Sequence, residues 1–221
     1  LDRLTDAVAR GYWVTVLELQ EENRARFAHM VEHSTDGVYE VDLDGRVAVD
    51  ADGSFGAVQS LGDGVNTPGN EWAPTPSRDG QRLLFASDGL GGAGRHDLFV
   101  ARWNGHAFVD PKPVPGLNTA DDDFDAAWLD DGRAIVFARS TDADKQPIQL
   151  FVARCDGARY VDAKPLALSF NTPDGWTLGP AIDWNKPNEL LVSGAAKAPH
   201  AGKLDIYRMA APRMEGRDGC V

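Results

Sequence analysis

Hydrophobic residues in this chain come in short runs separated by turn-forming residues, and one set of runs recurs at a regular interval. The stretch NTPGNEWAPTPSRDGQRLLFASD, at 66–88, joins an aromatic segment, an Arg-Asp-Gly corner and an apolar run. Similar stretches begin at Asn118 and Asn171, so the interval is 52 to 53 residues. Such an interval is typical of a repeated supersecondary unit.

Each unit is predicted to contain four short strands. The first, near 72–76 and 124–128, is apolar and ends at an Asp-Gly corner that favours a hairpin turn. The second is the apolar run at 83–87, which suits burial on both faces. The third, DLFVARW at 97–103, ends at Asn-Gly. The fourth, at 107–115, carries prolines, which cannot donate to a ladder and therefore favour an edge position.

Four antiparallel strands with a proline-bearing outer edge, repeated about every 50 residues, describe a β-propeller blade. We therefore predict an all-β fold, with residues 1–221 forming a single β-propeller of about four four-stranded blades, or alternatively five. Three blades are assigned to 66–117, 118–170 and 171–213, the last without a clear fourth strand. Residues 34–65 are expected to form a degenerate blade that includes a hairpin at 37–47.

Residues 1–33 allow two interpretations. The segment YWVTVLEL, at 12–19, is rich in β-forming residues and is predicted to pair as the outer strand of the last blade, which closes the ring and covers two sheet edges. Alternatively, residues 1–10 have apolar side chains at helical spacing and form a short N-terminal helix. The segment 21–33 fits a helix or a strand equally well.

The segment EWAPTPSRDGQRLLFASDGLGGAGRHDLFVARWNG, at 71–105, resembles the TolB-type β-propeller repeat. The matching positions are Glu71, Pro74, Ser77, Asp79, Gly80, Ser87, Gly91, Gly92, Asp97, Leu98, Phe99 and Val100. The resemblance extends over roughly residues 66–210 and implies a propeller in a periplasmic or secreted protein. It does not define the function, because this repeat occurs in assembly factors and in peptidase propellers. Residues 26–47 also resemble the opening of a PAS sensor domain, although propeller strands are predicted from residue 47 onward.

Composition excludes some classes of function. The formal net charge of −12 argues against nucleic acid, because phosphate binding uses clustered Lys and Arg. No apolar run approaches the roughly 20 residues of a membrane span, so membrane insertion is not predicted. Cys155 and Cys220 lack the spacing of a zinc site. We expect two unpaired thiols, with a disulfide between them as the alternative.

Acidic residues cluster in two loops of the unit that begins at Asn118. In a propeller, the loop entering the first strand and the loop between the second and third strands emerge on the same face. Asp121, Asp122, Asp142 and Asp144 are therefore candidate ligands for Ca²⁺ or for a basic group. No cofactor is required by the sequence. Asp123 aligns with Glu71, and the resemblance implies that it hydrogen-bonds the blade backbone.

Aromatic and cationic residues are predicted on the same face. The candidate ligand-binding residues are Trp72, Arg95, His96, Trp176 and His200. Such groups at a ring mouth are typical of recognition surfaces. We therefore predict a noncatalytic binding or scaffolding module for a protein, peptide or glycan, either monomeric or paired through sheet edges. The alternative is a hydrolase or lyase acting on carbohydrate or peptide through some of Asp121, Asp122, Asp142, Arg95, His96 and His200.

Overall fold

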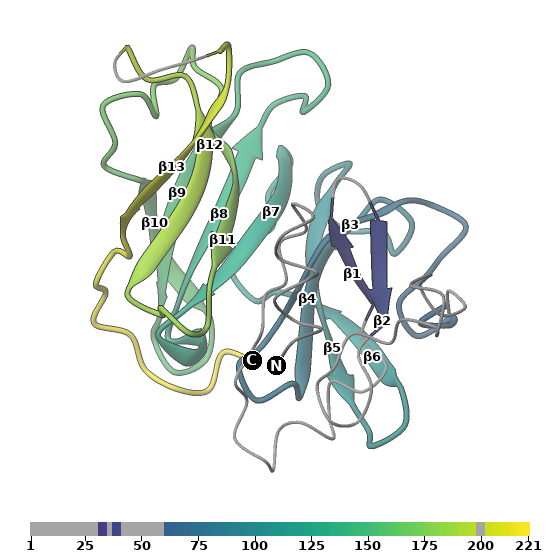
Figure 1. Ribbon diagram of the computed structural model, residues 1–221. Coiled ribbons are helices and arrows are strands. Elements are labelled where there is room, and N and C mark those ends of the chain that lie inside the picture. The colour runs from purple at the N-terminus through teal and green to yellow at the C-terminus, as the bar shows by residue number, and fades with distance from the viewer. Residues whose placement is uncertain (1–30, 35–36, 41–59, 198–201) are drawn as a thin grey trace, which may run out of the picture. The chain divides into compact units, whose positions relative to one another are not determined.

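Figure 1 shows a computed structural model of the chain. The structure describes residues 31–34, 37–40, 60–197 and 202–221. The chain divides into two compact units, Leu1–Ser60 and Leu61–Val221, and each is described by itself.

The described part of the first unit is a hairpin. Strands β1 (Val31–Ser34) and β2 (Gly37–Glu40) pair antiparallel. The first half of the hairpin expected at 37–47 is therefore a strand, and its described partner is the segment before it. The second half of that hairpin lies outside the described residues, as do the predicted helix at 1–10 and the predicted outer strand at 12–19.

The second unit contains three open antiparallel sheets, each built from strands that are consecutive in the chain (Figure 1). The first sheet consists of β3 (Glu71–Pro76), β4 (Arg82–Ser87), β5 (Asp97–Trp103) and β6 (Phe108–Pro113). The second consists of β7 (Asp122–Leu129), β8 (Ala134–Ser140), β9 (Gln149–Cys155) and β10 (Tyr160–Pro165), with a short 3-10 helix, η1 (Asp130–Gly132), between β7 and β8. The third consists of β11 (Leu178–Ile182), β12 (Glu189–Gly194) and β13 (Asp205–Ala210).

The described residues are all-β, with no α-helix among them, as the sequence predicts. No helix in this part of the chain has the length and apolar character to cross a membrane. The third sheet has three strands, in agreement with the expectation that its unit lacks a clear fourth strand.

The second strand of each four-stranded sheet is buried on both faces. In β4, Leu84 and Ala86 pack into a cluster shared with the second sheet, whereas Leu83 and Phe85 pack into a cluster on the opposite face. Strand β8 alternates in the same way, with Phe137 facing the first sheet. Because successive side chains of a strand point to opposite faces, a continuous apolar run fits such a sandwiched position, and this prediction is confirmed.

Prolines occupy the outermost strands of the first and second sheets. Pro111 and Pro113 lie in β6, and Pro165 ends β10. Both strands are sheet edges in the observed strand order, as predicted. An edge strand tolerates proline because its outward-facing groups have no ladder partner to satisfy.

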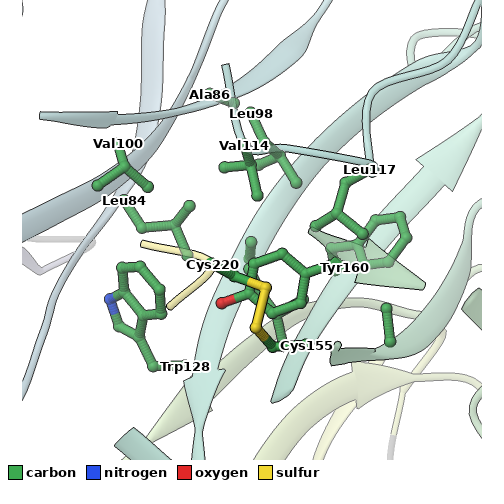
Figure 2. Packing of buried hydrophobic residues seen from close by; sticks show 14 residues of the cluster. Leu84, Ala86, Leu98, Val100, Val114, Leu117, Trp128, Cys155, Tyr160 and Cys220 are labelled. Atoms are coloured by element: carbon green, nitrogen blue, oxygen red, sulfur yellow. A yellow bond between two sulfur atoms is a disulfide. The ribbon is translucent and has the colours of Figure 1, made fainter. Parts of the chain in front are cut away.

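The core between the first and second sheets contains a disulfide that joins Cys155 of β9 to Cys220, with 5.8 Å between the Cα atoms. Figure 2 shows it beside the ring of Tyr160 and near the indole of Trp128. The expectation of two unpaired thiols is therefore wrong. The C-terminal segment returns to β9, where the backbone N–H of Arg217 donates to the Cys155 carbonyl at 2.9 Å.

Candidate functional site

The loops that lead into β3 and β7 are stabilised by the same type of contact. The Glu71 carboxylate accepts hydrogen bonds from the backbone N–H and the hydroxyl of Thr67, at 3.1 and 2.7 Å. The Asp123 carboxylate accepts the same two bonds from Thr119, at 2.7 and 2.9 Å. Asp123 is fully buried and also pairs with Arg139, at 2.6 Å. The predicted backbone contact of Asp123 is confirmed, and its carboxylate belongs to the scaffold.

The asparagines that begin the second and third units tie the loop after each outer strand back to the third strand of the same sheet. The Asn118 side chain accepts from the N–H of Leu98 and donates to its carbonyl, both at 2.9 Å. Asn171 makes the same pair of bonds with Leu150, at 2.9 and 2.8 Å, and also donates to the Leu166 carbonyl at 2.8 Å. Asn118 and Asn171 therefore occupy equivalent settings at the start of β5 and β9.

Three loops meet at Arg95, just before β5. Its guanidinium pairs with Asp122 at 2.8 Å, with Asp142 at 3.2 Å and with Asp144 at 2.8 Å. We call Arg95, His96, Asp122, Asp142 and Asp144 the Arg95 cluster. The structure thus brings together five of the residues that the sequence singled out, from the loop before β5, the start of β7 and the loop between β8 and β9. Their role in binding stays a prediction.

Close packing of the first two of these loops requires a glycine. A Cβ on Gly94 would lie 2.1 Å from the carbonyl oxygen of Asp121 and 2.9 Å from that of Thr119. A backbone obstruction of this kind cannot move aside as a flexible side chain can. Gly94 therefore sets the approach that allows Arg95 to reach Asp122.

Asp122 is the electrostatic centre of the cluster, with 3% of its side chain exposed. Burial raises its pKa, but hydrogen bonds from Arg95 and from the backbone N–H of Ala143 outweigh burial, and the pKa of Asp122 is lowered. Hydrogen bonds to Asp122 and Asp144 raise the pKa of Arg95 in turn. Asp122 therefore stays ionised at neutral pH, which suits an electrostatic anchor and disfavours a role as general acid.

His96 joins this cluster to an aromatic row. Its backbone N–H donates to Asp122 at 3.3 Å, and its Nδ1 lies 3.5 Å from the same carboxylate. The imidazole meets Trp72 edge to face, with 4.5 Å between ring centroids, and lies 6.4 Å from the ring of Phe124. His96 is buried, whereas 37% of Trp72 is exposed. The cluster therefore fixes the position of an aromatic side chain at the surface.

The remaining predicted residues lie apart from the cluster. Trp176 is also 37% exposed, and its backbone forms an isolated bridge with Ile148, at the other end of the loop that carries Asp142. No described contact joins the Asp121 carboxylate to the other three aspartates. His200 lies outside the described residues.

Within the described residues, no group of three or more His, Cys, Asp or Glu side chains is arranged to hold a metal ion. Arg95 and Lys145 already neutralise much of the acidic cluster, with Lys145 lying 3.2 Å from Asp142. The guanidinium of Arg95 takes the central position among the three carboxylates. Ca²⁺ binding by Asp121, Asp122, Asp142 and Asp144 stays a prediction.

The sequence did not point to the irregular backbone of the first strands. Strands β3, β7 and β11 each contain a register shift, and the residue at the shift has a positive φ: 48° at Ala73, 42° at Asp125 and 60° at Gly179. The aligned triplets are Ala-Pro-Thr at 73–75, Asp-Ala-Ala at 125–127 and Gly-Pro-Ala at 179–181. They have no residue type in common that predicts a bulge. The available signals were Gly179, because glycine inside a strand often marks a bulge, and Asp125, because aspartate tolerates left-handed backbone better than most residues.

Comparisons with known proteins do not define a family. No protein-family model matches the chain, and no curated protein matches it. Among solved structures, the chain is similar to a puromycin-hydrolyzing peptidase of Mycobacterium tuberculosis, with a TM-score of 0.38 and 16% identity over 78% of this chain. The chain spans 22% of the length of that peptidase.

Proposed function

We propose that the three sheets of the second unit are consecutive blades of a β-propeller with a TolB-type repeat. The first strands support this proposal because they follow one another in space as they do in sequence. The Thr75 hydroxyl of β3 donates to the Ala126 carbonyl of β7 at 2.9 Å, and the Gly179 N–H of β11 donates to Asp125 of β7 at 3.2 Å. Inner strands of neighbouring blades meet in this way.

The function that we propose for this chain is noncatalytic binding of a protein, peptide or glycan at the surface formed by the starts of the first strands. The observation that carries it is the exposure of Trp72 and Trp176, at the beginning of β3 and just before β11. Large aromatic side chains are the residues that most often dominate binding energy.

Preorganisation also supports recognition. Trp72 rests against His96, which is buried and tied to Asp122, and Asp122 is held by Arg95 and by backbone. A side chain held in this manner loses little conformational entropy on binding. The Arg95 cluster therefore acts in this proposal as the support of the surface and not as its chemically reactive part.

The test is selection of a ligand followed by substitution of the two tryptophans. Random peptides on phage and a glycan array are the probes, and the Kd of the selected ligand is measured by calorimetry. We expect Trp72→Ala or Trp176→Ala to raise that Kd at least tenfold, about 1.4 kcal/mol. Ile206→Ala, which removes another exposed apolar side chain (75% exposed) from β13, is the control and should leave the Kd within twofold.

Two outcomes would overturn the proposal. One is that no probe is enriched above the background of an unrelated protein. The other is a selected ligand whose Kd is unchanged by both tryptophan substitutions.

A further inference from the structure

The bulge residues of β3, β7 and β11 differ in one chemical respect. Ala73, Asp125 and Gly179 share the left-handed backbone, but only Asp125 carries a charge. The bulge therefore does not require a carboxylate, because two of the three strands form it without one. Aspartate tolerates this backbone better than most residues, and Asp110 and Asp162 adopt it at the bulges of β6 and β10. An arginine pairs with each of those two carboxylates, at 2.7 and 2.6 Å, whereas no described arginine pairs with Asp125.

Within the described residues, the Asp125 carboxylate accepts a hydrogen bond through one of its two oxygens. Its Oδ2 accepts the N–H of Gly179 at 3.2 Å. Within the described residues, no hydrogen bond reaches Oδ1, and no Lys, Arg or His forms an ion pair with Asp125. Asp125 is partly buried, and Oδ1 is not among the described side-chain atoms that are both buried and unpaired, so it reaches solvent.

No neighbouring charged group among the described residues is available to pair with Asp125. The other charged side chains of β7 and of the strands that contact it are Glu71, Arg82, Asp97, Arg102, Asp122, Asp123 and Arg139. Each of them is hydrogen-bonded elsewhere. Burial raises the pKa of Asp125, and the hydrogen bond from the backbone N–H of Gly179 opposes this effect only in part.

Asp125 lies next to the aromatic row of the proposed binding surface. Phe124 precedes it in β7, with its ring 6.4 Å from that of His96, and His96 contacts Trp72. Gly179, on the other side of Asp125, is exposed. A ligand that extends from Trp72 past Phe124 along β7 therefore meets Asp125 next.

We propose that Asp125 binds a primary ammonium group of the ligand through Oδ1. This inference rests on the proposed function, since it names the charged group of the ligand that the aromatic surface binds. An ammonium fits better than a guanidinium because only one carboxylate oxygen is free, whereas a guanidinium gains most from two. The N-terminus of a peptide and a polyamine both carry this group.

The experiment compares amines by calorimetry at pH 7. The probes are trialanine amide with a free N-terminus, its N-acetyl form and cadaverine. We expect the free peptide to bind at least tenfold more tightly than the acetylated peptide, and Asp125→Asn to remove that preference. Asp63→Asn, which removes an exposed carboxylate from the same unit, is the control and should leave the preference unchanged. Binding of cadaverine as tightly as the free peptide, with the same dependence on Asp125, would support the ammonium site with a polyamine as its source.

A stability measurement separates binding from a structural role. The pKa of Asp125 is raised in the folded state. The wild type therefore loses stability as the pH rises from the pKa of Asp125 in the unfolded chain through its pKa in the folded protein. Asp125→Asn should therefore have the higher urea midpoint at pH 7, and the difference should close below about pH 4. Asp63→Asn should not show this change.

Two results would overturn the inference. The first is equal binding of the free and acetylated peptides to the wild type, and the second is a lower urea midpoint of Asp125→Asn at pH 7. If Trp72→Ala still raises the Kd of a selected ligand in either case, the proposed binding function stands and only the ammonium site fails.

Discussion

Asn171 shows how one side chain ties a loop to the sheet beside it. It is 7% exposed, and its amide bonds both backbone groups of Leu150 and the carbonyl of Leu166. Asn118 repeats the first two of these bonds with Leu98. The value of Asn here lies in its having a donor and an acceptor on one short side chain.

We expect Asn171→Ala to lower the free energy of unfolding by about 2–3 kcal/mol, because the buried N–H of Leu150 loses its acceptor. The measurement is urea unfolding followed by tryptophan fluorescence. Asn188→Ala removes an exposed amide and should change the free energy by less than about 0.5 kcal/mol. Equal effects of the two substitutions would contradict this account of Asn171.

At the scale of elements, the first strand of each sheet combines an edge position with a bulge. A bulge leaves one residue outside the ladder and bends the strand. The bulges of β3, β7 and β11 occur at the point where these strands contact one another. The outer strands β6 and β10 carry the same irregularity, at Asp110 and Asp162. Bulges therefore mark both edge strands of the four-stranded sheets, while the buried central strands β4 and β8 stay regular.

The bulge in β3 allows a direct test of backbone strain. Ala73 has a φ of 48°, a region that costs residues with a Cβ about 1–2 kcal/mol. Glycine removes this cost, but part of the gain in stability is lost because an unfolded chain with Gly at this position has more conformational entropy to lose on folding. We therefore expect Ala73→Gly to stabilise the protein by about 0.5–1 kcal/mol. Ala181→Gly, in β11 at a position without positive φ, should destabilise it by a similar amount. The urea midpoints of the two variants should move in opposite directions, and a shift in the same direction would argue against strain at Ala73.

At the scale of the second unit, the disulfide ties the C-terminal segment to the second sheet. It spans 65 residues and includes the whole third sheet. In the chain-entropy description, a loop of this length reduces the entropy of the unfolded chain by an amount equivalent to about 4 kcal/mol. The C-terminal segment is therefore held to the second sheet by a covalent link as well as by packing.

We expect reduction of the Cys155–Cys220 bond to lower the free energy of unfolding by about 2–4 kcal/mol, because the unfolded chain regains that entropy. The measurement is urea unfolding with and without dithiothreitol. The double variant Cys155→Ala and Cys220→Ala serves as the control and should be insensitive to the reductant. A wild-type midpoint that does not move in dithiothreitol would contradict the expectation.

The sequence by itself determined the strands of the three sheets, their order and the edge positions. Apolar runs at 83–87, Asp-Gly and Asn-Gly corners and prolines in the outer strands act locally, over a few residues, so they can be recognised without coordinates. The backbone contact of Asp123 was also expected, because Asp123 aligns with Glu71 and the resemblance to the TolB-type repeat implies this contact there.

Only the tertiary structure decided which distant groups meet. The Arg95 cluster joins side chains up to 49 residues apart, the disulfide spans 65, and Asp125 meets Gly179 across 54. Each of these contacts depends on how one sheet or loop packs against the next, which a pattern of apolar positions does not encode. The left-handed backbone at Ala73 and Asp125 belongs to the same class, since neither residue type prefers it strongly enough to impose it alone. Contacts between neighbouring strands supply the free energy that holds it.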